Sequence, residues 1–454
     1  MEAGTRAAGS GAAEPDGGAG SGPPPQAPGP APSAFEPLLY VHVVISATLT
    51  GIVLLLYLVV FSTGMRLLWE NDFVSAHRWA FPLVCLPSSL VIGLLVKYLH
   101  APTAMTESLT DSLAGDTSRI EWRRFPVSAA QALISLFSGA ALGPEGGLGL
   151  LASQIATWYG HVFRLAPAQR ARLVYASVAS AYNGILQNPL FAGVLGVELS
   201  DKVTGRAVLA ANLIGGAVGY AVFGWMFHMV DAPNVAGLLG LEPLEDVGLV
   251  DALLIVVASL LGVVLAAVSA VLFKVVERAF ARFRDEVVRA IVAGAIFSVA
   301  GVIAPVLMFS GETQVHSLVE DPAHYGAALL LLLGVAKLAL LAVGFRSGFL
   351  GGAIFPTVFA LVAVALAIDL VLPDGVAQEG VLVAGLMVGF MVVAFRTPFM
   401  VILLVAFMLE ASMDHVALIV LAVAAVLIVS PLLERLVASR KAGSVATGEG
   451  VGDG

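Results

Sequence analysis

Long apolar runs follow one another through most of this chain, and they constrain its fold more than any other feature. A helix that crosses a bilayer needs about 20 apolar residues. Of the 454 residues, 59% are hydrophobic and only 12% are charged, against about 25% charged in soluble domains. We therefore expect an all-α integral membrane protein that crosses a cell membrane many times. The clear runs are Leu38–Leu68, Trp79–Tyr98, Ala207–Phe227, Leu249–Phe273, Ala290–Phe309, Ala327–Phe345, Phe355–Leu372, Val381–Phe395 and Val416–Val429.

Four further apolar runs are short and interrupted by glycine or proline. Such segments resemble helices that end part-way through the bilayer, where irregular backbone is tolerated only inside protein or beside an aqueous cavity. Unequal helix lengths of this kind are typical of transporters. The short runs are Val127–Leu142, Leu148–Val162, Leu173–Ala181 and Leu190–Val197.

The loops between the runs differ in charge, and this predicts the orientation. The loops Asp231–Asp251, Ser310–Gly326 and Leu372–Gly380 contain carboxylates and no lysine or arginine. Basic loops stay in the cytoplasm, so the acidic loops are expected outside and the C-terminus inside. The basic positions are Arg119, Arg123, Arg124, Arg164, Arg170, Arg172, Lys274, Arg278, Arg282, Arg284, Arg289, Arg435, Arg440 and Lys441.

The two ends of the chain differ from the rest. Residues 1–34 are rich in glycine, alanine and proline, and residues 442–454 are also poor in large apolar side chains. Such segments do not bury enough surface to fold, so both are expected to be disordered tails around one transmembrane domain at 35–441. The single cysteine, Cys85, has no partner for a disulfide or a cysteine-based metal site. No cofactor, metal or nucleic acid is expected as a ligand.

An internal repeat relates two halves of this domain, roughly residues 35–230 and 249–441. A glycine-rich turn opens a helix at 143–147 and again at 351–356, and a proline-initiated segment that ends near a carboxylate follows each turn. Pro398 follows Pro189 by 209 residues, and Pro356 follows Glu145 by 211. Matching interrupted segments in two halves of a membrane protein indicate a transport site at the repeat interface. Chance coincidence of glycine and proline breaks is the simpler alternative.

The glycine-rich turns carry the chemistry expected of an anion site. A helix N-terminus offers unpaired N–H groups and partial positive charge, and glycine lets the backbone approach an ion closely. An ionisable residue within the membrane suggests function, so the Glu145 carboxylate is expected to occupy this site and to leave when protonated. The alternative is that Glu145 only caps its helix. The predicted anion-binding amides belong to Gly146, Gly147, Ala353, Ile354 and Phe355.

At these residues the chain resembles the chloride channel and chloride–proton antiporter (CLC) family. The segment 143–147, Gly-Pro-Glu-Gly-Gly, is similar to the family's G-R-E-G-P motif, with Glu145 at the gating glutamate. Residues 352–356 resemble G-x-F-x-P, residues 396–410 resemble R-A-P-L-T-G-I-I-L-V-x-E, and residues 188–198 resemble N-A-P-L-A-G. The resemblance covers about Leu38 to Arg440. It implies an antiparallel inverted repeat of tilted and half-spanning helices, a homodimer, and one anion path in each protomer. Many members also carry cytoplasmic nucleotide-binding CBS domains, and too little chain follows Arg440 to form them.

The chain departs from the family pattern at the inner end of the path. The family's serine falls at Ala104, with Thr103 as the neighbouring substitute, and the family's inner tyrosine falls at Leu433. The inner glutamate of the antiporters has no clear counterpart. Glu198 comes slightly early, and Ser200 or Asp201 falls nearest. Glu198 and Asp201 are therefore candidate inner proton acceptors.

The sequence contains no pattern typical of an intramembrane enzyme. An intramembrane protease needs a serine and a histidine in reach of each other, and no such arrangement is evident, so an enzyme is not expected. A carrier on another inverted repeat, a fluoride exporter, a passive channel and a proton-coupled chloride antiporter stay open. Lys337 and Arg346 are expected to reach the membrane surface or to pair locally. Glu312 is expected in a solvated outer loop.

Overall fold

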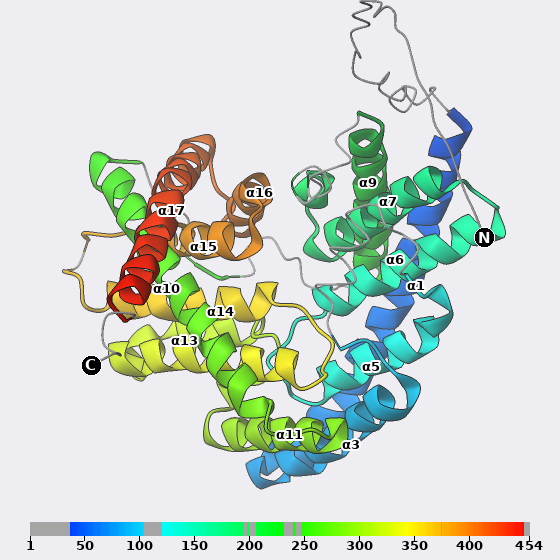
Figure 1. The fold of residues 1–454 in the computed structure, drawn as a ribbon, viewed down its shortest axis with the longest axis horizontal. Helices are drawn as coiled ribbons and strands as arrows, with labels where there is room; N and C mark the ends of the chain where they lie inside the picture. Colours follow the sequence, from blue (N-terminus) through cyan, green and yellow to red (C-terminus); the bar gives the residue numbers. More distant parts are fainter. Residues whose placement is uncertain are drawn as a thin grey trace, which may run out of the picture. The chain divides into compact units, whose positions relative to one another are not determined.

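The fold is described here from a computed structural model, which covers residues 37–103, 120–194, 198, 206–230, 239–241, 247–373 and 375–448. Over these residues the chain is helical apart from turns and one isolated β-bridge (Figure 1). The short helices are α2 (Asp72–Ala76), α12 (Gln314–Glu320) and the 3-10 turns η1 (Arg78–Ala80), η3 (Trp122–Arg124), η4 (Phe191–Gly193) and η5 (Pro305–Leu307). The main helices are α1 (Pro37–Trp69), α3 (Phe81–Leu99), α5 (Phe125–Phe137), α6 (Glu145–Val162), α7 (Pro167–Leu186), α9 (Arg206–Val230), α10 (Leu249–Phe280), α11 (Glu286–Ile303), α13 (Pro322–Arg346), α14 (Ile354–Asp369), α15 (Glu379–Phe395), α16 (Pro398–Met408) and α17 (Met413–Gly448).

The long apolar runs form the long helices predicted for them. Seven described helices are long and apolar enough to cross a membrane. The runs Phe355–Leu372 and Val381–Phe395 were predicted to be ordinary spans, but their helices, α14 with 16 residues and α15 with 17, are shorter than the roughly 20 residues that a span needs. The run predicted at Ala290–Phe309 also ends early, at Ile303, because Pro305 follows and has no N–H to continue the helix. Most of α14 and α15 is buried, which explains their nearly continuous apolar sequence.

The two halves repeat the same packing, as the sequence repeat predicts. In the first half, α7 packs against α1, α6 and α9. In the second half, α15 packs in the same way against α10, α14 and α17. The two groups of helices lie beside each other in Figure 1. The fold is therefore an all-α inverted repeat.

Equivalent helices of the two halves also touch each other, at α3 and α11. A Cβ on Gly93 would lie 2.6 Å from Cα of Val287, and one on Gly294 would lie 2.1 Å from Oγ of Ser89. The absent side chains allow these helices to approach closely, as small residues do between membrane helices. At one end Lys97 forms an ion pair with Asp285, the residue that caps α11. The hydrogen bond from Lys97 holds the pKa of Asp285 below its usual range.

The Lys337 ammonium is buried in the middle of this fold. The side chain is 0% exposed, so the predicted extension to the membrane surface is wrong for Lys337. Its Nζ donates to the carbonyl oxygens of Leu307, Met308 and Phe309 over 3.0, 3.0 and 2.8 Å and lies 4.6 Å from the ring centre of Phe359. The chain turns out of η5 here, and the lysine satisfies carbonyls that have no helical partner. Arg346, by contrast, pairs locally with Glu277 at 3.2 Å.

Replacing Lys337 by methionine is expected to destabilise the protein by about 3 kcal/mol, since three buried carbonyls lose their donor. Methionine keeps much of the apolar stem, so the loss reports on the ammonium. Thermal unfolding in detergent measures the effect. Lys274→Met, at an exposed position of α10, is the control and should unfold at the wild-type temperature. Equal midpoints for the two variants would show that the buried ammonium contributes nothing.

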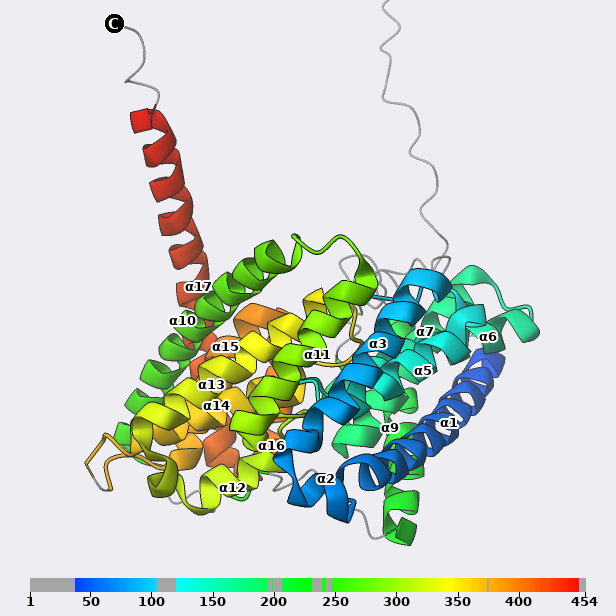
Figure 2. The ribbon, with the colours of Figure 1, turned by 90° about the horizontal axis from the view of Figure 1, so that it is seen from below.

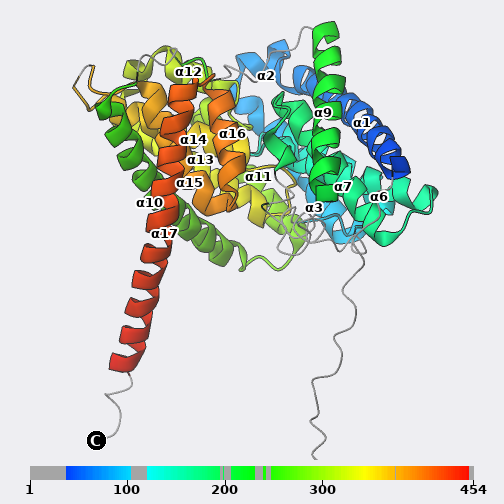
Figure 3. The same cartoon turned by 90° about the horizontal axis from the view of Figure 1, so that it is seen from above.

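The last helix, α17, extends away from the other helices. Figures 2 and 3 show its C-terminal part projecting beyond α10 and α15. The helix continues without a break through Pro431 to Gly448. Position 433 is thus part of a continuous helix, and the chain does not turn back there toward the glycine-rich turns.

Candidate functional site

The two glycine-rich turns lie directly against each other. Gly143 donates to the carbonyl of Gly352 over 3.0 Å, and Gly352 donates to the carbonyl of Gly143 over 2.7 Å, which makes an antiparallel bridge. A Cβ on Gly146 would lie 2.1 Å from the carbonyl carbon of Gly351. No side chain fits in that space, so glycine is required for the close backbone approach. The turns at 143–147 and 351–356 thus form one structural unit.

Glu145 begins α6, and its carboxylate crosses to the first turn of α14. Oε1 accepts a hydrogen bond from the Ile354 amide over 2.7 Å. The amides of Phe355 and of Glu145 itself also stabilise the carboxylate electrostatically. Amides in the first turn of a helix have no partner within the helix and carry partial positive charge. The Glu145 carboxylate therefore lies where α14 would hold a free anion.

Glycines on both sides make room for this carboxylate. A Cβ on Gly143 would lie 1.9 Å from Oε2 of Glu145, and a Cβ on Gly352 would lie 2.2 Å from its carboxyl carbon. Glu145 is 2% exposed, yet Oε2 has no hydrogen-bond partner among the described residues. A buried carboxylate oxygen without a donor is unfavourable. The carboxylate is thus held through one oxygen, in a space that the missing glycine side chains leave open.

Of the other residues predicted for the anion site, Ala353 lies beside the Glu145 carboxylate, whereas Gly147 and Thr103 face other surroundings. Ala353 is the N-cap of α14, directly before Ile354, whose amide binds the carboxylate. A Cβ on Gly147 would face Ala132 and Tyr57 rather than α14. Thr103 is exposed, and the residues after it, 104–119, lie outside the described part of the chain. Anion binding by these residues stays a prediction.

Glu198 binds a second helix N-terminus in the other half. Its two carboxylate oxygens accept from the amides of Phe399 and Met400, at the start of α16, over 2.6 and 2.9 Å. The side chain is half-buried. Asp201 lies outside the described residues. The contact shows Glu198 to be an acceptor at a helix start, and its role as an inner proton acceptor stays a prediction.

A second carboxylate, Glu312, lies near the gate. It is partly buried rather than fully solvated, so the predicted solvated loop is wrong for this side chain. Glu312 hydrogen-bonds to Ser310 and interacts electrostatically with Lys337 and with Glu145. The sequence offered little to link Glu312 with Glu145, because the two are 167 positions apart.

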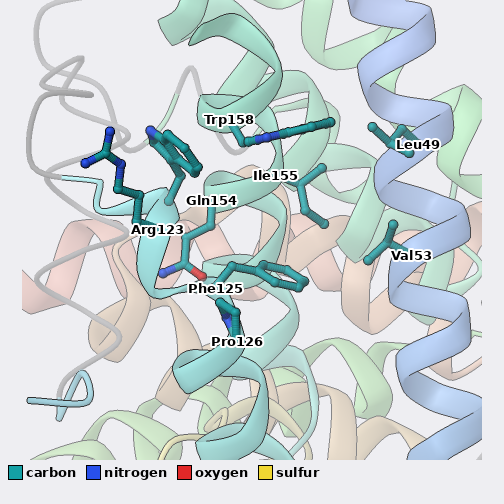
Figure 4. Close-up of a pocket in the computed structure, with 9 residues that line it drawn as sticks. Leu49, Val53, Arg123, Phe125, Pro126, Gln154, Ile155 and Trp158 are labelled. Atoms are coloured by element: carbon teal, nitrogen blue, oxygen red, sulfur yellow. The ribbon is translucent and has the colours of Figure 1, made fainter. Parts of the chain in front are cut away.

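A pocket of about 410 Å³ elsewhere in the protein is not the anion site (Figure 4). It is almost entirely apolar and lies between α1, α5 and α6, so it offers an inorganic anion few hydrogen-bond donors. Neither Glu145 nor the start of α14 lines it. The lining residues are Leu49, Val53, Trp122, Arg123, Phe125, Pro126, Gln154, Ile155 and Trp158.

The sequence and the fold are similar to those of known proteins. The sequence profile described as "Voltage gated chloride channel" matches residues 88–430, which is well over half of the chain and includes both glycine-rich turns. The chain belongs to the voltage-gated chloride channel family. This membership makes it a multi-pass membrane protein that transports small anions.

Individual members of the voltage-gated chloride channel family are distant in sequence. A ClcB-like protein from Ralstonia nicotianae is 26% identical over 307 residues, covering 63% of this chain and 67% of the relative. The ion-transport protein YfeO of Escherichia fergusonii is 24% identical over 338 residues, covering 71% and 77%. A slow cyanobacterial chloride–proton antiporter has a similar structure, with a TM-score of 0.74 at 16% identity over 90% of this chain and all of the antiporter. A CLC-type fluoride–proton antiporter has a TM-score of 0.68 at 18% identity, over 86% of this chain and 94% of the antiporter.

Proposed function

We propose that the chain carries chloride or a similar small anion through a path inside each protomer, with Glu145 as the gate. The observation that supports this most directly is the hydrogen bond from the Ile354 amide to the Glu145 carboxylate. Both a carboxylate and a halide are anions that a helix N-terminus binds. They therefore compete for one place, and transport requires the carboxylate to leave.

Protonation supplies a reason for the carboxylate to leave. A neutral carboxyl group gains less from the partial charge of α14 than a carboxylate does. The amides of Ile354 and Phe355 then become free for an incoming anion. Anion binding and Glu145 protonation thus favour each other, and by linkage the effect is reciprocal.

Two modes of transport are consistent with such a gate. In proton-coupled antiport, a second acceptor returns the proton to the cytoplasmic side, and Glu198 or Asp201 is proposed for that role. In a passive channel, Glu145 only opens and closes the path. The solved structures with similar folds are described as chloride–proton and fluoride–proton antiporters, which favours the coupled mode and leaves fluoride as an alternative substrate.

The proposed setting follows from the loops and from the family. We place the protein in the cell membrane with the C-terminus in the cytoplasm, since the basic loops lie on that side. We also propose a homodimer in which each protomer has its own path. No cofactor is required, because helix amides and one carboxylate suffice for the gate.

Purified protein in liposomes tests the function. Chloride efflux, measured with a chloride-selective electrode, is expected at rates well above those of protein-free liposomes. The reversal potential under opposed chloride and proton gradients then separates the modes. A value at the chloride equilibrium potential indicates a channel, and a displaced value indicates antiport. Absence of chloride and fluoride flux from folded protein would overturn the proposed function.

A further inference from the structure

The hydroxyl of Tyr182 lies on the same side of α6 as the gate. Tyr182 is near the end of α7 and is 5% exposed. A Cβ on Gly149 would lie 2.7 Å from the Tyr182 hydroxyl oxygen and 3.2 Å from the ring carbon that bears it. Gly149 follows Glu145 by four positions, which is about one helical turn on the same face. The glycine therefore lets this hydroxyl lie against α6 one turn beyond Glu145.

The hydroxyl and the gate interact across this turn. Tyr182 and Glu145 are close enough to interact electrostatically. α6 runs from Glu145 toward the basic loop at Arg164, the side that we propose faces the cytoplasm. In that orientation the hydroxyl lies on the cytoplasmic side of Glu145, about one turn along α6.

Other hydroxyls nearby are already used. Ser153 and Thr157 on α6 donate to carbonyl oxygens of their own helix, at Leu150 and Ser153, over 2.7 and 2.8 Å. Ser347 donates to the carbonyl of Val343 over 2.5 Å. Tyr182 makes no such bond to a described residue, and its ring packs on Phe191 with the centres 6.3 Å apart. The ring is thereby fixed while the hydroxyl stays available.

An anion inside a membrane protein needs such a donor. Leaving water costs a small anion its hydration shell, and polar groups of the path must replace that shell. The start of α14 supplies amides at the gate, and the backbone of α17 beyond Pro431 continues as a helix that projects away from the other helices (Figure 2). A phenol is a good donor to an anion and stays neutral near pH 7.

We propose that the Tyr182 hydroxyl donates a hydrogen bond to the transported anion immediately inside Glu145 and so forms part of the anion-binding site. This inference rests on the proposed function, since it names a residue of the same path. Because Gly149 has no side chain, it leaves free the space that the hydroxyl occupies.

The test is Tyr182→Phe, which removes only the hydroxyl. A hydrogen bond to a charged partner is strong enough that its loss weakens anion binding about tenfold. Chloride and fluoride affinities are measured by isothermal titration, and half-saturation of flux is measured in liposomes. Fluoride, the stronger hydrogen-bond acceptor, should lose more affinity than chloride.

Tyr57→Phe is the matched control. Tyr57 is buried, and its hydroxyl has no partner among the described residues. That hydroxyl faces Gly147, about 200° around α6 from Glu145. The control should keep wild-type affinity and flux.

Three outcomes are distinguishable. Weaker anion binding in Tyr182→Phe alone supports the inference. Equal affinities in wild type, Tyr182→Phe and Tyr57→Phe, with each protein folded by size-exclusion chromatography, overturn it while the proposed function stands. No anion flux in the wild type overturns the proposed function itself.

Discussion

Glu145→Gln is expected to abolish proton movement while anion flux continues. Glutamine has nearly the shape of the protonated side chain but does not titrate, so the competition between carboxylate and anion at the Ile354 amide ends. Anion flux should then become independent of pH, whereas wild-type flux is expected to rise as the pH falls and Glu145 becomes protonated. Paired recordings with a chloride electrode and a pH electrode on the same liposomes measure both quantities.

A matched variant separates the gate from a general charge effect. Glu320→Gln removes an exposed carboxylate from α12 and should leave both the pH dependence and any proton movement as in the wild type. Coupled proton movement that survives in Glu145→Gln would contradict the gate assignment. Loss of anion flux in that variant would also contradict it, because the neutral side chain is expected to free the path.

Gly146→Ala is expected to abolish transport by forcing the two glycine-rich turns apart. The new Cβ would lie 2.1 Å from the carbonyl carbon of Gly351 and 2.3 Å from the amide nitrogen of Gly352. Both contacts are to backbone, which cannot rotate away as a side chain can. The cost is expected near 3 kcal/mol, at the upper end for overpacking, and the bridge between Gly143 and Gly352 should break. Flux in liposomes and the unfolding midpoint in detergent record the two effects.

Gly224→Ala is the control for a glycine in a helix. The atom nearest to its added Cβ would be Oε1 of Gln187, at 3.5 Å, so α9 accepts the methyl group. Transport and stability should be unchanged or slightly improved, since alanine favours the helix. Wild-type flux in Gly146→Ala would show that the close approach of the turns is not needed for transport.

Much of the fold was predictable because a bilayer requires long apolar helices, and long apolar runs can be recognised directly in the sequence. The repeat offset also predicted that the two glycine-rich turns belong together. Side-chain burial was less predictable. Lys337 was expected near the surface because a sequence does not show the unpaired carbonyls at Leu307–Phe309 that hold it.

The candidate site was predictable where a motif and physical chemistry agree. Glu145, Ile354 and Phe355 lie in the glycine-rich turns, and the structure brings them together. Tyr182 and Glu312 were missed because each looks ordinary in its own segment. Their relevance depends on packing between helices far apart in the chain. Gly149, four residues after Glu145, was the one local feature that pointed to a group packed beside the gate. That this group is Tyr182 becomes clear only from the packing of α7 against α6.

The contact between Glu145 and Ile354 has a consequence for how such a protein can originate. The two positions are 209 residues apart, the same separation as the prolines that open the following segments of the two halves. Glu145 opens α6 and Ile354 opens α14, so the two are structural counterparts. Two identical copies of one ancestral half would carry the same residue at both positions. Glutamate in both copies would place two carboxylates beside the backbone bridge between Gly143 and Gly352, where they would repel each other. Isoleucine in both copies would leave the site without a carboxylate. A gate of this kind can arise only after the copies of a duplicated gene have diverged at this position.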